Sequence, residues 1–252
     1  MKILLSPAKS LDFKTSLEFP FCSNFEFQKE SKQLIKQLQK LNSKKIQDLM
    51  HISLDLAELN VERFKKWEIA TEINDNNQPC ALIFNGEAYK GLAFSTLNEE
   101  ELLRAQNQLR ILSGLYGILK PLDLIAPYRL EMGTKLKINE KTPNLYRFWG
   151  DKITKYLEKE EKELVVNLAS NEYSKVIQFE RLTAKTITPV FKEFKNGSYK
   201  TIMMYAKHAR GQMANYILSN NIQQSEEIKN YTIDGYRFDE NQSSEKEWVF
   251  TR

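Results

Sequence analysis

The spacing of apolar residues in the first quarter of the chain predicts one strand followed by three helices. Lys2–Leu5 is a short apolar run that ends at a Ser-Pro turn, as expected of a buried strand. Between Asn24 and about Leu41 the apolar residues recur at helical spacing, opposite a face of lysines. Two further helices are predicted to follow, with Ser43 and Ser53 as candidate N-caps.

The pattern in the rest of the chain mixes strands and helices. Asn98 is a candidate N-cap, because three glutamates follow it at the positive end of a helix that would run to about Leu109. The Asn196-Gly197 pair predicts a hairpin between its flanking strands. The predicted segments are a polar loop over 74–79, strands over Ala81–Phe84 and Leu164–Leu168, a helix over Tyr146–Lys162, hairpin strands over Thr186–Phe194 and Tyr199–Met204, a helix over Ala206–Ser219, and a final strand pair over Tyr231–Phe238 and Trp248–Thr251.

This order of elements predicts an α+β fold with a mixed sheet and surrounding helices. It lacks the regular strand–helix alternation of a doubly wound fold. We see no repeat and no linker long enough to divide the chain, so residues 1–252 are expected to form a single domain. With 41% hydrophobic and 28% charged residues, the chain can bury a full core without a metal, disulfide or cofactor.

The number of cysteines and the length of the apolar runs indicate the cellular compartment of the protein. Cys22 and Cys80 are the two cysteines, too few for a disulfide framework or a cysteine-rich zinc site. No apolar run approaches the roughly 18 residues of a membrane span, and the first one is too short for a signal peptide. We therefore expect a cytoplasmic protein without a membrane interaction and without an obligate protein partner.

The charge is segregated along the chain, although the net charge is only +4. One segment holds six lysines and a single acid, and no acid occurs between Lys195 and Gly211. Such segregation favours a polyanionic ligand. The lysines of the first segment are Lys29, Lys32, Lys36, Lys40, Lys44 and Lys45.

Three segments combine cations with turns. In the first, Ser6–Phe13, Lys9 follows the first strand and would face a ligand, with Ser6 and Ser10 as hydroxyl donors and Asp12 as a partner for the lysine. The alternative is an ordinary turn with a solvated lysine.

The second segment, Leu112–Gly133, contains Gly114 and Gly117 followed by Lys120 and Arg129. Glycines let a ligand approach the backbone, and exposed N–H groups bind phosphate oxygens. The segment loosely resembles the hairpin of a helix-hairpin-helix motif. A tight turn inside the core is the alternative.

The third segment contains Lys207 and Arg210 on one face of a predicted helix. Two cations at the positive end of a helix are unfavourable unless an anion lies between them, which favours an anion site. The alternative is that acidic residues of the C-terminal segment neutralise them.

Catalytic and metal-binding motifs are absent from the sequence. Two histidines, His51 and His208, are too few for a histidine-rich metal site, whereas a carboxylate site stays open. We therefore name no catalytic and no metal-binding residue. The acids that could form a carboxylate set are Glu87, Glu131, Asp151, Glu172 and Asp239.

Six spaced motifs resemble the YaaA family, also called DUF328 or UPF0246. The resemblance implies an α+β fold with a positively charged cleft and a helix-hairpin-helix-like element. It also implies a DNA-binding protein of the peroxide stress response, linked to lower free iron and to protection of DNA from oxidative damage. The motifs are SPAKSLDF (6–13), NGEAYKGL (85–92), the stretch 112–133, RFWGD (147–151), VNLASNEY (166–173) and YAKHARG (205–211).

The leading hypothesis is a DNA-binding protein of the oxidative stress response, with phosphate contacts largely independent of sequence. The contacting residues would be Lys9, Lys120, Arg129, Lys207 and Arg210. The alternative is an enzyme that acts on a nucleotide or another phosphorylated small molecule, with Asp12, Glu131 or Glu172 in acid–base roles. Iron binding by exposed carboxylates is a third possibility with weaker support.

Overall fold

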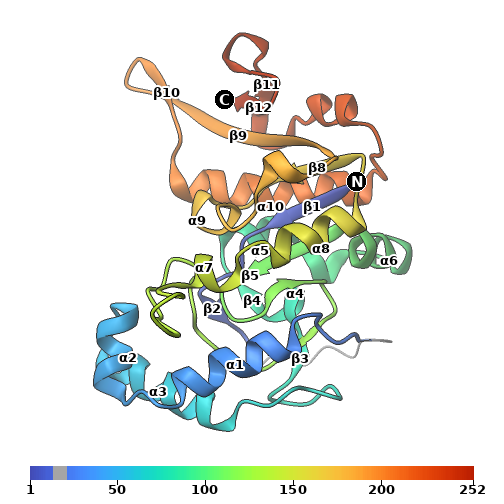
Figure 1. The fold of residues 1–252 in the computed structure, drawn as a ribbon. Coiled ribbons are helices and arrows are strands. Elements are labelled where there is room, and N and C mark those ends of the chain that lie inside the picture. The colour runs from blue at the N-terminus through green and yellow to red at the C-terminus, as the bar shows by residue number, and fades with distance from the viewer. Residues whose placement is uncertain (14–21) are drawn as a thin grey trace.

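The computed structural model describes residues 1–13 and 22–252, and an eight-stranded sheet lies at its centre (Figure 1). The strands follow the order β11-β12-β9-β8-β1-β5-β6, and β10 pairs with β9. Their bounds are β1 Lys2–Leu5, β5 Leu109–Ser113, β6 Gly117–Leu119, β8 Leu164–Asn167, β9 Lys185–Lys195, β10 Ser198–Lys200, β11 Arg237–Phe238 and β12 Glu247–Thr251. Two small pairs lie apart from it, β2 (Ser10–Leu11) with β4 (Phe84–Asn85) and β3 (Gln78–Pro79) with β7 (Leu124–Ile125).

The sheet is mixed but mostly parallel. β1 pairs in parallel with β5, where Ile3 lies opposite Leu109, and with β8, where Lys2 lies opposite Val165. β8 with β9 and β9 with β12 are parallel as well, whereas β6, β10 and β11 are antiparallel. The predicted α+β class and mixed sheet are confirmed.

Helices surround the sheet, and α10 packs against β9, β1 and α5. The α-helices are α1 Gln28–Leu38, α2 Ser43–Met50, α3 Leu54–Lys66, α4 Cys80–Ile83, α5 Glu87–Leu92, α6 Glu99–Gln108, α7 Leu145–Trp149, α8 Lys152–Glu160, α9 Asn171–Ser174 and α10 Met203–Ser219. Short 3₁₀ helices cover Phe94–Thr96, Phe179–Arg181, Ser225–Asn230, Ile233–Gly235 and Glu240–Gln242. In the part of the chain that is described, no helix is both long and apolar enough to cross a membrane.

Two of the three predicted N-caps are confirmed. The Ser53 side chain accepts a hydrogen bond from the Leu56 amide, and Asn98 forms a reciprocal capping box with Glu101. For α2 the prediction is one residue off, because the side chain of Asn42 rather than Ser43 accepts from the Lys45 amide.

Four predicted segments differ from the structure. The strand predicted over Ala81–Phe84 is mostly helix α4, since an apolar run buried on several sides does not reveal its own period. The helix predicted over Tyr146–Lys162 is broken at Gly150, whose φ of 53° ends α7. Of the strand predicted over Tyr231–Phe238, two residues form β11 and three, Ile233–Gly235, form a 3₁₀ helix. The strand predicted over Tyr199–Met204 ends at Lys200, and its last two residues belong to α10.

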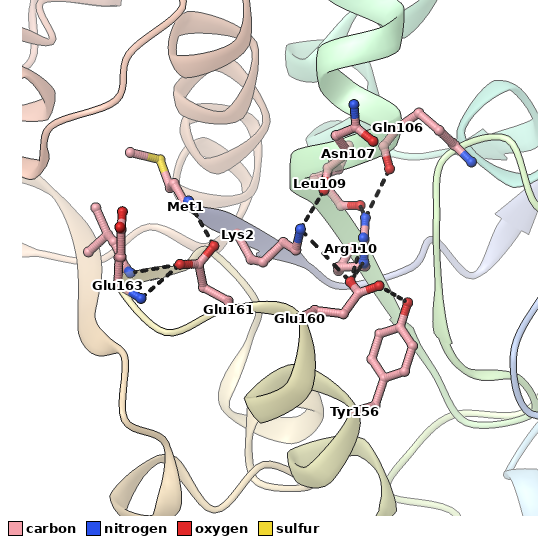
Figure 2. A network of polar contacts seen from close by, with 11 residues as sticks. Met1, Lys2, Gln106, Asn107, Leu109, Arg110, Tyr156, Glu160, Glu161 and Glu163 are labelled. Carbon is pink, nitrogen blue, oxygen red and sulfur yellow. Dashed lines mark hydrogen bonds and ion pairs between the residues drawn. The ribbon is translucent and has the colours of Figure 1, made fainter.

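A polar network joins the amino ends of β1 and β5 to the end of α8 (Figure 2). The Arg110 side chain is 3% exposed, and its Nε donates to Glu160 Oε2 over 2.8 Å. Tyr156 donates to the other carboxylate oxygen over 2.9 Å. The α-amino group of Met1 lies 2.7 Å from Glu161 Oε2. Burial, the largest single influence, would raise the pKa of Glu160. The charge and hydrogen bonds of Arg110, the hydrogen bond from Tyr156 and the charge of Lys2 together exceed it, so the net pKa is lowered.

Helices α5 and α10 touch backbone to backbone at two glycines. A Cβ at Gly211 would lie 1.8 Å from the Ala88 carbonyl oxygen, and one at Gly91 would lie 2.2 Å from the His208 carbonyl oxygen. No side chain fits between the helices at either point. This contact fixes the position of α5 on the first half of α10.

We expect Glu160→Ala to lower the free energy of unfolding by about 3 kcal/mol, because it leaves the Arg110 charge buried without its partner. Urea unfolding at pH 7 measures the loss. The folded-state pKa of Glu160 is depressed, so its contribution is present above the unfolded pKa and is lost as the pH falls through the folded one. The difference from the wild type should therefore shrink at acid pH. Glu62→Ala, which removes an exposed pair with Lys65, is the matched control with little effect; equal losses in both variants would contradict the expectation.

We expect Gly211→Ala to destabilise the protein by about 2 kcal/mol or more, because the new methyl group would overlap the Ala88 carbonyl. Helix propensity alone would change stability in the opposite direction, by roughly 0.5–1 kcal/mol. The sign of the shift in thermal melting therefore separates the two effects, and a rise in the melting temperature would refute the close contact.

Candidate phosphate-binding crevice

The candidate site lies at the carboxyl ends of β1, β5 and β8, where the chain leaves the sheet. Strand β5 lies on one side of β1, and β8 followed by β9 lies on the other side, so the direction in which the chain crosses the sheet changes at β1. Ligands of open parallel sheets bind at such a change of direction. Here Ser6 Oγ accepts a hydrogen bond from the Ser170 amide over 2.9 Å and lies 3.2 Å from Ser170 Oγ. The Tyr89 hydroxyl donates to the Ser6 carbonyl over 3.0 Å.

Lys9 and Arg129 meet at this end of the sheet and share one carboxylate. Lys9 Nζ lies 2.6 Å from Glu131 Oε2, and Arg129 Nη2 lies 2.9 Å from Glu131 Oε1. The ion-pair partner of Lys9 is therefore Glu131, and two cations face one anion. Arg63 is close enough that the charge of Arg129 lowers its pKa further, beyond the larger lowering caused by burial.

Arg129 retains an unused donor. Its Nε is buried and makes no hydrogen bond, which costs free energy unless a water or ligand oxygen fills the gap. A cavity of about 10 Å³ adjoins it, roughly the volume that holds one water. Residues around this cavity are Pro7, Ala8, Lys9, Tyr128, Arg129, Leu130, Glu131 and Tyr173.

The third segment reaches the same region through α5. A Cβ at Gly86 would lie 3.2 Å from that of Ala8, so the start of α5 adjoins the Lys9 turn. Next to it, Glu87 Oε2 lies 3.8 Å from His208 Nδ1 of α10. The Lys9 turn and the part of α10 around His208 therefore lie on either side of the start of α5. We call the region of Lys9, Arg129 and the first half of α10 the crevice.

Arg210 lies on the buried face of α10, among Ala206, Ala209, Met213 and Ala214. Burial lowers the pKa of its guanidinium group. Within the described residues, Arg210 has no ion pair with a carboxylate, and the C-terminal acid Asp234 is paired with Arg252 instead. Desolvated charge without an opposite partner is the strongest sign of an anion site in this structure.

The helix-terminus argument for Lys207 and Arg210 is wrong. Helix α10 begins at Met203, so both cations lie beyond its first turn, where the dipole effect has fallen off. Lys207 is exposed and Arg210 is partly buried. The case for Arg210 rests on burial without a partner.

The glycine turn does not form an exposed phosphate loop. Gly114 and Gly117 are buried in the turn of a β-hairpin between β5 and β6, so its flanking elements are strands and not helices. Ser113 Oγ already accepts two amide hydrogens from within the turn, and Trp149 Nε1 donates to the Gly114 carbonyl over 3.1 Å. The tight turn inside the core, our alternative, is what the structure has.

Lys120 lies at the opposite end of the sheet. It follows β6, whose last residue Leu119 pairs with Ile111, and its charge acts on Lys2 beside the network of Figure 2. Its amide donates to Asp123 Oδ2 over 2.7 Å. Lys120 is therefore separated from the crevice by the length of β5.

Two of the five candidate acids border one pocket. Glu131 and Glu172 line an open pocket of about 630 Å³. The end of α2, including His51, lines the same pocket. Glu172 Oε1 accepts a hydrogen bond from the Gly133 amide over 3.0 Å. The other acids have local partners: Glu87 pairs with Lys90, Asp151 with Lys155, and Asp239 caps a 3₁₀ helix.

In the described residues, these acids do not form a metal-binding site. Over residues 1–13 and 22–252, no three His, Cys, Asp or Glu side chains come together as a metal site. Both cysteines are free, Cys22 exposed and Cys80 buried. Nothing in this arrangement supports the iron-binding hypothesis.

Ser170 is the crevice residue that the sequence analysis missed. It follows the buried strand β8 as Ser6 follows β1, so the same signal was present in the sequence. Arg63 carried no comparable signal, because α3 comes from a distant part of the chain.

The fold is that of an α+β protein with a mixed, mostly parallel sheet, and the crevice is a candidate anion site at the carboxyl ends of its parallel strands. Comparison with known proteins then identifies its relatives. Residues 1–242 match the family described as Peroxide stress protein YaaA. The chain is 48% identical over 254 residues to UPF0246 protein FP0718 of Flavobacterium psychrophilum, with both chains fully covered. It is 46% identical over 256 residues to a UPF0246 protein of Janthinobacterium sp. (strain Marseille), covering all of this chain and 98% of the relative. The chain belongs to the YaaA (UPF0246) family of peroxide stress proteins.

We expect Glu131→Gln to raise the affinity of the crevice for tripolyphosphate about tenfold, because it frees the charges of Lys9 and Arg129 for the ligand. Isothermal titration calorimetry measures the change. Glu226→Gln, which removes an exposed pair with Lys229, is the control and should have no effect. If both variants bind like the wild type, the crevice does not take anions through these two cations.

Proposed function

We propose that this member of the peroxide stress family binds DNA through phosphate contacts at the crevice and thereby helps to limit iron-driven damage to that DNA. Arg210 carries the proposal, since its charge is largely desolvated and has no carboxylate partner among the described residues. Lys9, Arg129 and Lys207 supply further positive charge around the same region. Phosphate contacts of this kind position the DNA backbone and carry no information about the base sequence.

A row of lysines on α1 and α2 adds to the attraction for a polyanion. Lys29, Lys32 and Lys36 follow one another at helical spacing, and all of them are exposed. Neighbours three and four residues apart on a helix are about 5–6 Å from one another. Lys40, Lys44 and Lys45, also exposed, extend the row. Such a surface contributes a long-range, salt-dependent attraction for nucleic acid.

Partial burial favours a second candidate, an enzyme that acts on a nucleotide or another phosphorylated small molecule. The Arg129 side chain is only 17% exposed, and its free Nε faces a small enclosed space. Glu131 and Glu172 border the adjoining pocket and are the candidates for acid–base work there. A small ligand reaches such groups more easily than a duplex does.

The two free cysteines bear on the location of the protein in the cell. We propose a cytoplasmic protein, because a reducing compartment suits free thiols, one of them exposed. DNA is the proposed partner, and neither a membrane nor an obligate protein partner is invoked.

We expect Lys207→Glu with Arg210→Glu to weaken binding to a labelled 20-base-pair duplex severalfold. The slope of log K against log salt should fall by about two, because two phosphates would no longer be neutralised by a side chain. Fluorescence anisotropy over a salt series measures both quantities. Lys159→Glu with Lys246→Glu, two exposed lysines, has the same net charge change and serves as the control.

The outcomes separate the two candidate functions. A normal melting curve for the double variant together with unchanged duplex affinity would place DNA binding elsewhere. If nucleotides raise the melting temperature of the wild type and displace the duplex, while Arg129→Gln abolishes both effects, the small-molecule enzyme is the better account. Arg129→Gln also tests the crevice should the charge reversal at Arg210 prevent folding.

A further inference from the structure

Exposed apolar side chains concentrate in one short part of the chain. Five large apolar residues between 194 and 205 are 41–62% exposed, whereas the others that are exposed in the described chain are scattered. Exposed apolar surface that is contiguous marks an interaction site more often than single exposed residues do. We call this group the hairpin patch; its members are Phe194, Tyr199, Met203, Met204 and Tyr205.

The patch is built on a hairpin and the helix start that follows it. Strands β9 and β10 project from the sheet, and the chain returns to α10 directly afterwards (Figure 1). Asn196 and Gly197 have φ values of 52° and 76°, as expected of the tight turn that suits hairpin twist. The Phe194 amide donates to the Arg252 carbonyl over 2.8 Å, so the base of the hairpin is anchored to β12.

Two aromatic rings form a fixed platform on the hairpin. Phe194 and Tyr199 lie directly opposite each other across the strands. Their ring centroids are 5.2 Å apart, with the ring planes at 66°. An edge-to-face pair of this kind holds both rings in place, yet the Phe194 side chain remains 62% exposed. Little conformational entropy is lost when a flat ligand stacks on such rings.

Positive charge lies close to the platform on the same hairpin. Lys195, Lys200 and Lys207 are exposed, and no acid occurs between residues 195 and 211. Lys195 and Lys200 alternate with the two rings and so extend from the other face of the hairpin, where Lys200 lies opposite Glu193 in the strand register. Glu193 is held by Arg252 at 2.8 Å and by the Tyr236 hydroxyl. The hairpin therefore offers an aromatic pair on one face and cations on the other.

We propose that the hairpin patch binds a single-stranded nucleic acid, an inference that rests on the proposed function and specifies the form of DNA it engages. Unpaired bases stack on Phe194 and Tyr199, and the strand continues across the edge of the hairpin, where its phosphates contact Lys195 and Lys200. Aromatic stacking combined with a basic track is how proteins hold single strands without sequence preference. A duplex keeps its base faces inside the helix, so it gains only the charge contacts.

The same surface is poorly suited to the other occupants that apolar patches attract. A second copy seated here would bring two positively charged hairpins together. A lipid surface would be met first by the hairpin tip, whose four residues Lys195–Ser198 are polar or glycine. Neither occupant matches both the rings and the charge.

The test compares two variants on two forms of DNA. Phe194→Ala with Tyr199→Ala removes the rings, and Phe194→Leu with Tyr199→Leu keeps apolar side chains while removing the flat faces. Fluorescence anisotropy measures binding to labelled dT15 and to a duplex of equal length. Both variants should bind dT15 about tenfold or more weakly than the wild type, because each stacked base contributes roughly a factor of 5 to 100. Duplex affinity should stay within twofold. Leu54→Ala with Leu103→Ala, at exposures of 46% and 47%, is the matched control.

The outcomes distinguish this inference from the proposed function. Unchanged dT15 affinity in both variants, or equal weakening on both DNA forms, would overturn it, as would rescue by leucine. A wild type that binds duplex but not dT15 overturns the single-strand inference alone, whereas binding to neither overturns the proposed function as well. Loss of a wild-type dimer on sizing with light scattering, or of sedimentation with phosphatidylserine vesicles, would assign the patch to a second copy or to lipid instead.

Discussion

The parallel pairing of β1 with two distant strands is the constraint on which the rest of the structure depends. Four residues of β1 hold together β5, more than one hundred positions away, and β8, more than one hundred and sixty away. Because both pairings are parallel, the chain leaves all three strands at the same edge of the sheet. That edge collects the Lys9 turn, Ser170 and, through α5, the first half of α10. The opposite edge is occupied by the ion network around Arg110 (Figure 2). One end of the sheet thus carries an ion network around Glu160 and Glu161, and at the other end Lys9 and Arg129 share Glu131.

Features that depend on neighbouring residues could be predicted from the sequence, whereas contacts between distant segments could not. Ser53 and Asn98 act as the predicted caps, and the Asn196-Gly197 hairpin is present, because each depends on a few adjacent residues. The sharing of Glu131 by Lys9 and Arg129 needed the parallel register of the sheet, which the irregular order of elements does not reveal. The choice between a phosphate loop and a tight core turn at Gly114 and Gly117 could not be made from the sequence, for a related reason. A glycine demanded by close packing against Trp149 looks the same in sequence as one that admits a ligand.

The crevice and the hairpin patch suit different kinds of ligand. In the crevice the positive charge is partly buried and partly matched, so a phosphate group must compete with Glu131 for Lys9 and Arg129. At the hairpin the cations are solvated and the aromatic rings are exposed. The first arrangement favours a closely held phosphate, and the second favours a flexible strand. Both features involve α10, which begins beside the hairpin and has Arg210 on its buried face.

The central place of β1 also has a consequence for how the chain is made. A strand that emerges first must wait for β5 and then for β8 before its backbone groups are paired on both sides. At synthesis rates of about 5–20 residues per second, that delay is roughly 10–30 s. During this time the apolar residues Ile3, Leu4 and Leu5 have no sheet to enter. A growing chain therefore exposes these three apolar side chains until the partner strands of β1 have been made.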